Sequence, residues 1–353
     1  MKHRLFSFLL LLITLPFGLG AQSNSIWQAI KECDPYKAEA SIEAGADLNE
    51  VDAKGRTPLL AAAAGGTQFQ VPERQLKIVK MLLEAKSDPN VQDERGFTPM
   101  HYAAFHGNYE MVDALISYKA KIDLKCDLNQ EPLIVAARYP PLNEDRKRTF
   151  EKLLENGASP LVKDNSGKTA IHWLCSHKTK SESPLVADRT ILAICQALNE
   201  KGASLTNTDD DGNTPFAYAV REGHGQTTLW LLDKGANARA KSLTDYNALH
   251  YATERGQIKL VDRLIKAGLD LNGLTNDKHQ ADAKGYFFPK GSTALDIAMI
   301  SEYEAKDNFI KKEWKGLAAA LKQRGAISRT YKQYVKGFNV MKGPKAGGGS
   351  KIR

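Results

Sequence analysis

The chain has 353 residues, of which 42% are hydrophobic and 25% charged, with only 14 prolines and four cysteines. This composition is typical of a folded protein, and it excludes a disordered chain, a collagen-like repeat and a small disulfide-stabilised domain. The formal net charge of +8 raises the question of an anionic partner, so the place of that charge in the chain matters.

The first 21 residues have the pattern of an export signal. Lys2 and Arg4 are followed by an apolar run over residues 5–17 and by small residues that end at Ala21. The run is shorter than the roughly 20 residues of a membrane-spanning helix, which argues against a transmembrane anchor. We therefore predict a cleaved signal peptide over residues 1–21. No asparagine lies in an Asn-x-Ser/Thr sequence, which favours the bacterial periplasm, with general secretion as the alternative.

Much of the positive charge lies at the end of the chain. Residues 327–353 contain seven cations and no acid, and the residues between the predicted signal and this segment are close to neutral. The sequence Gly-Gly-Gly-Ser at 347–350 is typical of a flexible segment. We interpret residues 327–353 as a solvated, flexible basic tail and expect no nucleic-acid partner.

A short motif recurs between these two ends. It begins with Asp, reaches Gly three residues later, and continues two residues further with Thr-Pro or Thr-Ala. Counting strong and weak copies, the Pro or Ala position is residue 58, 99, 132, 170, 215, 248 and 294. Two of the spacings are 33 residues and the others are longer by 5 to 13. Most units then close with an apolar pair and Gly-Ala, as at 235–236.

Local backbone chemistry explains why these residue types recur. The Gly accepts the left-handed backbone of a tight turn. The Thr after it is placed to cap a helix, and Pro is favoured in the first turn of that helix. The Gly that follows the second apolar segment is a typical helix C-cap. Each unit is therefore predicted to be a turn followed by two helices.

This pattern resembles the ankyrin-repeat family, whose units of 33 residues carry Thr-Pro-Leu-His. The resemblance covers residues 25–326 and implies an all-α solenoid of about eight helix pairs with β-turn fingers, occupying residues 22–326. We place a partial N-terminal unit at 25–51 and further units starting near 52, 93, 126, 164, 209, 242 and 288. Cys126, Asn129 and Asp245 depart from the family's usual Asp or Gly, which predicts irregular fingers.

Surplus residues form four insertions. Three fall between the two helices of a unit, near residues 67–74, 139–145 and 178–188, and we expect them on one edge of the stack. The fourth, near residues 276–289, lengthens a finger and contains Tyr286, Phe287 and Phe288. Insertions in repeat proteins map to loops, often on the binding face.

The histidines fit the repeat better than a metal site. His101, His172 and His250 occupy the motif's last position, where the resemblance implies hydrogen bonds between neighbouring units. His106 and His177 follow five residues later, which does not match the i, i+4 pair of a helical zinc site. We expect these two at the exposed end of their helix, as partner contacts.

The sequence offers no catalytic constellation. It lacks the zinc-protease, serine-hydrolase and phosphate-loop motifs. Residues 207–212 resemble a calcium loop, but Tyr218 stands where that loop needs a bidentate Glu. We therefore predict no enzyme, no metal and no cofactor.

The four cysteines are Cys33, Cys126, Cys175 and Cys195. An exported protein can oxidise such residues. Cys175 and Cys195 are predicted at inward positions of the two helices of one unit, so they are candidates for a disulfide; the alternative is two buried thiols.

Aromatic residues recur along the first helices. Tyr102, Trp173, Tyr218 and Tyr251 share one position, which favours packing between units over partner contact. Better contact candidates are Arg, Lys, His and aromatic residues on the fingers and on the first helices, because such side chains anchor interfaces. They are Arg56, Arg95, Phe97, Phe105, His106, Tyr139, Lys168, His177, Arg221, Tyr246 and Arg255, with Tyr286, Phe287 and Phe288 of the lengthened finger.

The resemblance implies a binding module. We predict a non-enzymatic protein-binding module of the bacterial envelope that occludes or regulates another periplasmic protein, as an immunity or self-protection inhibitor of a secreted or cell-wall hydrolase would. The alternative is a periplasmic scaffold for stress or redox enzymes. Binding of an anionic polymer or lipid by the basic tail is a further hypothesis.

Overall fold

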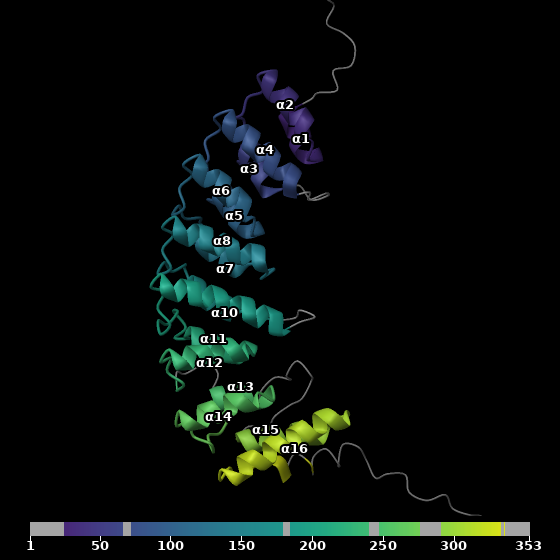
Figure 1. The fold of residues 1–353 in the computed structure, drawn as a ribbon, viewed down its shortest axis with the longest axis vertical. Coiled ribbons are helices and arrows are strands. Elements are labelled where there is room, and N and C mark those ends of the chain that lie inside the picture. Colours follow the sequence, from purple (N-terminus) through teal and green to yellow (C-terminus); the bar gives the residue numbers. More distant parts are fainter. Residues whose placement is uncertain are drawn as a thin grey trace, which may run out of the picture.

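The computed structural model describes residues 25–65, 72–178, 184–239, 247–275, 291–332 and 335. All regular elements in these residues are α-helices, and they form one elongated, curved stack from the N-terminal to the C-terminal end (Figure 1). The predicted signal peptide lies outside the described residues. In the part of the chain that is described, no helix combines the length and apolar character needed to cross a membrane.

The helices pair in chain order, so each odd-numbered helix and the helix after it form one unit. Unit 1 holds α1 and α2, and unit 8 holds α15 and α16, which confirms the predicted solenoid of about eight helix pairs. The helices are α1 (Ile26–Glu32), α2 (Pro35–Glu43), α3 (Pro58–Ala64), α4 (Pro72–Glu84), α5 (Pro99–His106), α6 (Tyr109–Ser117), α7 (Pro132–Arg138), α8 (Glu144–Glu155), α9 (Ala170–Cys175), α10 (Pro184–Glu200), α11 (Pro215–Glu222), α12 (Gly225–Asp233), α13 (Ala248–Glu254), α14 (Ile258–Lys266), α15 (Ala294–Glu304) and α16 (Asn308–Gln323).

The repeated motif starts α5 and α11 as its chemistry predicts. Thr98 caps α5 by accepting the His101 N–H at 3.3 Å, and Thr214 caps α11 by accepting the Ala217 N–H at 3.2 Å. Pro occupies the first turn of both helices. Gly107 ends α5 with φ +68°, a backbone angle that residues with a Cβ rarely adopt.

The core lies between two layers of helices. First helices pack on neighbouring first helices, second helices on neighbouring second helices, and the apolar sides of both layers meet. Leu59, Met100 and Phe150 are completely buried there. Ala103 and Ala104 of α5 are also fully buried, and their small side chains let the first helices approach closely.

The fingers are tight turns joined to one another by backbone hydrogen bonds. Asp127 N donates to Arg95 O at 3.0 Å, linking the fingers of units 4 and 3. The prediction of an irregular finger at residues 126–130 is wrong, because Asn129 adopts the left-handed angle, φ +56°, that Gly provides elsewhere. Asp245 lies outside the described residues.

The insertions inside units partly become helix instead of loop. Helices α4, α8 and α10 have 13, 12 and 17 residues, against nine in α6 and in α12. The extra turns come from residues near 72–74, 144–145 and 184–188, which we expected in loops. These stretches therefore extend the second helix of the unit, and residues 72–74 and 144–145 are exposed in it.

The first residues of the predicted flexible tail belong to the fold, which corrects that prediction. Thr293 Oγ1 donates to Ile327 O at 2.9 Å, and the hydroxyls of Ser292 and Thr330 lie 2.8 Å apart. The carboxylate of Asp296, which is completely buried, accepts the backbone N–H groups of residues 329–331. Residues 327–332 are therefore docked on unit 8 by complementary hydrogen bonds.

Candidate protein-binding face

The fingers and the first helices form one continuous surface, which we call the inner face. On it, three finger aspartates hold an aromatic residue of their own unit. Tyr102 Oη donates to Asp93 Oδ2 at 2.6 Å, and Trp173 Nε1 donates to Asp164 Oδ2 at 2.8 Å. A third pair, Tyr218 Oη with Asp209 Oδ2, has a distance of 2.7 Å. These bonds fix the orientation of the rings.

The aromatic stripe divides between core and surface. Tyr218 and Tyr251 are 4% and 5% exposed, in agreement with the predicted packing role. Tyr102 and Trp173 are half-buried, so each also presents part of its ring to solvent. Burial, together with the hydrogen bond to Asp209, raises the pKa of Tyr218 above its usual value, so the phenol remains a hydrogen-bond donor.

Cations and rings alternate on the middle of the inner face. Arg138 Cζ lies 4.8 Å from the centroid of the Trp173 ring, and Lys168 Nζ lies 4.5 Å from the same ring. Lys168 Nζ is also 5.0 Å from the Tyr218 ring, over which Arg221 Cζ lies at 4.7 Å. We call these five residues the cation–aromatic ladder. It runs across units 4, 5 and 6.

Further aromatic residues continue this surface toward unit 3. The rings of Phe105 and Tyr139 have centroids 4.7 Å apart, and Arg138 lies 5.5 Å from the Tyr139 ring. Phe105 is 37% exposed and Tyr139 is half-buried. Phe97 is half-buried, and its ring packs against Tyr102 at 5.5 Å. The structure thus brings together Phe105, Tyr139, Lys168 and Arg221 of the predicted set.

Two predicted arginines lie apart from the ladder. Arg56 is turned back onto its own finger, where its Nε and Nη2 donate to Asp52 Oδ2 at 2.9 and 2.6 Å. In this unit Ala61 stands where units 3, 5 and 6 have a ring donor, which leaves that oxygen to the arginine. Arg95 is exposed on the finger of unit 3.

Three other predicted contact residues make hydrogen bonds within the stack. His106 Nε2 lies 2.9 Å from Ala64 O, and His177 Nε2 lies 2.7 Å from Ala137 O. Arg255 donates to Arg221 O. In each case a side chain satisfies a carbonyl at the C-terminal end of the preceding unit's first helix, a group that lacks a partner within its own helix.

The same role is filled in unit 4 by Arg146, which is completely buried. Its guanidinium donates to Ala104 O and Phe105 O at the end of α5, and no ion pair with a described acid accompanies it. Burial lowers the pKa of Arg146 to about 10. The charge is therefore held by the negative end of a helix.

Tyr246, Tyr286, Phe287 and Phe288 lie outside the described residues. Sequence reasoning missed Arg138 as a candidate, although a signal existed. Arg138 occupies the same position of its first helix as Phe105 and Arg221, six residues after the Pro of the motif. Trp173 and Tyr218 were noticed as a stripe, but their contact with cations of neighbouring units depends on the stacking.

The histidines of the motif have the predicted structural role. His101 Nε2 lies 3.0 Å from Gln130 O, and His172 Nε2 lies 3.0 Å from Asn207 O, both in the finger region of the next unit. His250 makes the equivalent contact with Gly273 O at 2.9 Å. In the described residues no cluster of His, Cys, Asp and Glu could hold a metal ion.

Cys175 and Cys195 are completely buried and are in contact as free thiols. Their predicted proximity is therefore confirmed, while the disulfide is not formed in this structure. Burial, followed by the contact with Cys175, raises the pKa of the Cys195 thiol. Such a thiol behaves as a small apolar core residue.

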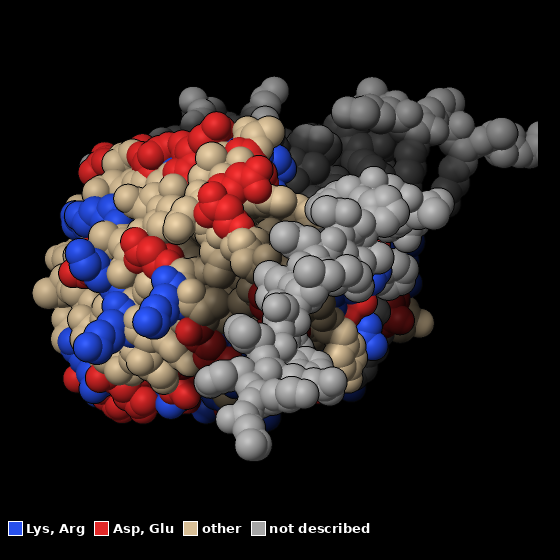
Figure 2. All heavy atoms as spheres, turned by 90° about the horizontal axis from the view of Figure 1, so that it is seen from above, with Lys and Arg blue, Asp and Glu red and all other residues tan. Residues whose placement is uncertain are grey.

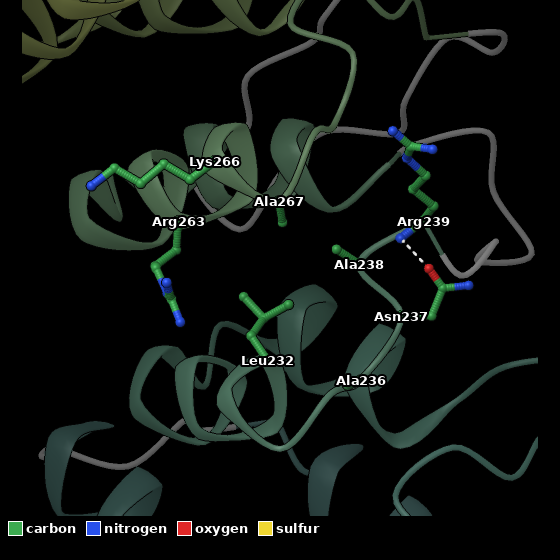
Figure 3. A pocket seen from close by; sticks show the side chains of 8 residues that line it. All are labelled: Leu232, Ala236, Asn237, Ala238, Arg239, Arg263, Lys266 and Ala267. Carbon is green, nitrogen blue, oxygen red and sulfur yellow. Dashed lines mark hydrogen bonds between the residues drawn. The ribbon is translucent and has the colours of Figure 1, made fainter.

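A cavity between second helices is a weaker candidate for a site. It has a volume of about 510 Å³ and lies between units 6 and 7 (Figure 3). Arg263 is paired with Asp233, and Arg239 donates to Gly268 O at 2.7 Å. Lys266 and Arg239 lie on different sides of the lining and do not point toward one another, so the cations around this cavity do not converge on one ligand (Figure 3).

The end of the stack that carries α1 and α2 is also a weaker candidate, because it carries charges of both signs. Acidic and basic side chains share this surface (Figure 2). An interaction based on net charge alone therefore finds no uniform patch there. The ladder is the better-defined candidate because its charges and rings are fixed relative to one another.

Comparison with known proteins supports the repeat assignment. A family model described as ankyrin repeats (3 copies) matches residues 26–125, 69–164, 133–242 and 185–275. The match ends before α15, although Thr293 caps that helix as in the preceding units.

Similar curated proteins share only part of their length with this chain. The B-cell lymphoma 3 protein homolog of Mus musculus is 29% identical over 52% of this chain and 46% of its own length. Ankyrin repeat protein nuc-2 of Neurospora crassa is 27% identical over 70% of this chain and 21% of its own. Palmitoyltransferase ZDHHC13 of Mus musculus is 30% identical over 70% of this chain and 35% of its own. This chain thus spans less than half the length of each.

Proposed function

The chain belongs to the ankyrin-repeat family, and from this premise we propose that it is a non-enzymatic module that binds another protein with its inner face. Ankyrin repeats generally mediate protein–protein interaction, and the fold alone does not specify the partner. The proposal therefore depends on what the inner face of this chain presents.

The cation–aromatic ladder is the observation that supports this proposal. It combines Arg, Trp and Tyr, the residue types that dominate the binding energy of protein interfaces. Trp173 and Tyr218 are each held by an aspartate, so ordering them on binding costs little conformational entropy. Phe105 and Tyr139 add exposed aromatic surface beside the ladder. A partner covering units 3 to 6 would contact the exposed parts of this surface, beneath which Tyr218 is buried.

The export pattern of residues 1–21 supports a place for this function outside the cytoplasm, in the periplasm of a bacterium. The partner is then another envelope protein. We propose that binding occludes or regulates it, as an immunity or self-protection inhibitor of a secreted or cell-wall hydrolase does. Such inhibition is steric, because a rigid surface can cover a cleft without supplying a catalytic group.

The binding face can be tested by site-specific photocrosslinking in cells of the source organism. A photoreactive amino acid replaces Phe105, which is 37% exposed on the inner face. The matched control replaces Val186, which is 58% exposed on α10, a second helix. We expect one defined protein adduct from position 105 and none from position 186. Equal capture at both positions, or capture from 186 alone, contradicts the proposal.

Two further measurements test the proposed compartment and the proposed effect on the partner's activity. Fractionation of cells producing the full chain tests the compartment, and a cytoplasmic location rejects the envelope role without affecting the binding face. The activity of the captured partner is then measured with and without this protein. Inhibition supports occlusion, whereas unchanged or raised activity supports the alternative of a scaffold.

A further inference from the structure

Two of the three cations of the ladder, Arg138 and Lys168, are held in place by rings and not by acids. Lys168 contacts two rings and Arg138 contacts Trp173, at the distances given above. Among the described residues, neither charged group has a hydrogen-bond acceptor or an ion-pair partner. A cation–π contact fixes a charge without using its N–H groups. These donors therefore remain available to a ligand.

The acids in this part of the inner face are already engaged. Asp164 and Asp209 each accept two backbone N–H groups on one oxygen and a ring donor on the other. Glu222 accepts the Nε–H of Arg221 at 2.9 Å, which leaves the two terminal nitrogens of that guanidinium. The ladder thus keeps N–H donors that these acids do not use. Because it is half-buried, an anion placed there interacts more strongly than in bulk water.

We infer that the ladder is a receptor for carboxylates and that it holds an extended acidic segment of the partner protein. This inference rests on the proposed function and specifies the chemistry of the partner. Arg138, Lys168 and Arg221 belong to units 4, 5 and 6, and packed helices lie about 10 Å apart. An extended peptide advances about 3.3 Å per residue, so an acid at every third position meets one cation after another.

A nucleic acid fits this surface less well than an acidic peptide. Single-stranded nucleic acids bind by stacking bases on open ring faces. Trp173 and Tyr218 each already contact two cations, which leaves little ring face for a base. Asp210 and Asp211 are exposed on the finger of unit 6, and they disfavour a polymer with a charge at every position. A peptide with spaced acids avoids them.

The inference can be tested with a defined peptide probe and the full chain. The probe is a fluorescent peptide of about twelve residues with Glu at every third position and Gly or Ser between, a length that spans units 4 to 6. The reference peptide has Gln in place of each Glu. Fluorescence anisotropy measures both dissociation constants at about 50 mM and about 200 mM salt.

Two variants make the test specific to the ladder. The double variant Arg138→Gln with Lys168→Gln removes the two unpaired cations. The control Arg56→Gln removes a cation at the same finger position as Lys168, but one that is already paired with Asp52. Thermal unfolding confirms that both variants are folded.

We expect the Glu peptide to bind at least about tenfold more tightly than the Gln peptide and to weaken with salt. The double variant should lose about tenfold in affinity, and Arg56→Gln should bind as the unchanged protein does. Equal binding of the two peptides, no binding of either, or an equal loss in the control overturns the inference. Tighter binding of a single-stranded oligonucleotide also overturns it. If photocrosslinking at position 105 still captures a partner in these cases, the proposed function stands and only the acidic segment is rejected.

Discussion

A single position of the repeat shows how a residue is matched to its surroundings. The third residue of the first helix is His in units 3, 5 and 7, where its Nε2 faces a carbonyl of the next finger region. In unit 8 the groups that face this position are the backbone N–H groups of residues 329–331. Asp296, an acceptor, stands there instead of a donor. Burial opposes its ionisation, but these hydrogen bonds outweigh burial and lower its pKa.

At the residue scale, His101 predicts a loss of stability in acid. Burial lowers the pKa of His101 from 6.5 to about 4, so between these values the unfolded chain binds more protons than the folded one. Stability therefore rises with pH through this window, and the penalty at pH 5 relative to pH 7 is about 2 kcal/mol. Gln cannot titrate but can cap α5. Replacing His101 with Gln should therefore remove the loss of stability that His101 causes between pH 7 and pH 5. Urea unfolding at both pH values measures it.

The control for His101→Gln is a variant that loses a hydrogen bond without losing a group that titrates between pH 5 and pH 7. Tyr102→Phe, in the same helix, breaks the bond to Asp93 and should cost the same free energy at both pH values. For His101→Gln the cost at pH 7 should shrink or change sign at pH 5. A cost independent of pH would show that the buried imidazole is not responsible.

At the scale of the element, α7 begins differently from the other first helices. Glu131 stands where Thr98 caps α5, and its side chain makes no capping hydrogen bond. Burial raises the pKa of Glu131 to about 7, Lys125 lowers it, and Asp123 raises it further. The folded state thus favours the neutral acid, and between pH 4.5 and about 7 the contribution of this group to stability falls as pH rises.

Glu131→Thr should therefore stabilise the protein, since Thr both caps α7 and removes the buried acid. A cap contributes about 1 kcal/mol, and the loss of the acid adds to it at pH 7. The free energy of unfolding in urea is the measurement. Glu131→Gln is the matched control, because it removes the charge without supplying the cap. If the Thr variant is no more stable than the Gln variant, the capping argument is wrong.

Elements that follow from local chemistry could be predicted from the sequence. The Thr-Pro starts and Gly ends fixed the first helices, because those signals act within a few residues. The longer second helices, the docking of residues 327–332 and the role of His106 could not be predicted in this way. Each depends on an acceptor or an apolar surface contributed by another unit. A local motif does not encode where that unit's groups point.

At the scale of the whole molecule, contacts are local in sequence although the molecule is long. Helices in substantial contact belong to the same unit or to neighbouring units throughout the described residues. The ladder depends on this arrangement, because Lys168 of unit 5 reaches the Tyr218 ring of unit 6. The sequence stripe of aromatic residues was visible beforehand, but the alternation with cations appears only when the units are stacked. Lys168 and Arg221 were predicted as contact residues, and Arg138 was missed although it has the same helix position as Arg221.

Such a stack should transmit a local defect mainly to its neighbours, and the tryptophans allow this to be measured. Trp27 lies in unit 1 and Trp314 in unit 8, at opposite ends of the stack (Figure 1). In a solenoid, stability is approximately a sum of unit and nearest-neighbour terms. A protein that keeps one of these two tryptophans, with the other three replaced by Phe, reports the unfolding of one end.

Asp296→Asn keeps the shape of the side chain but replaces one of its two accepting oxygens by a donor, which then faces backbone N–H groups of residue 293 or of residues 329–331. We expect it to destabilise unit 8 by about 2–3 kcal/mol, because buried N–H groups lose their acceptor. The urea midpoint reported by Trp314 should then fall more than that reported by Trp27. Ile26→Val, in the buried part of α1, is the control at the opposite end of the stack. It should lower the urea midpoint reported by Trp27 more than the midpoint reported by Trp314. Equal shifts at both ends in both variants would mean that the units unfold as one block, because the interfaces between them are then stronger than the defects.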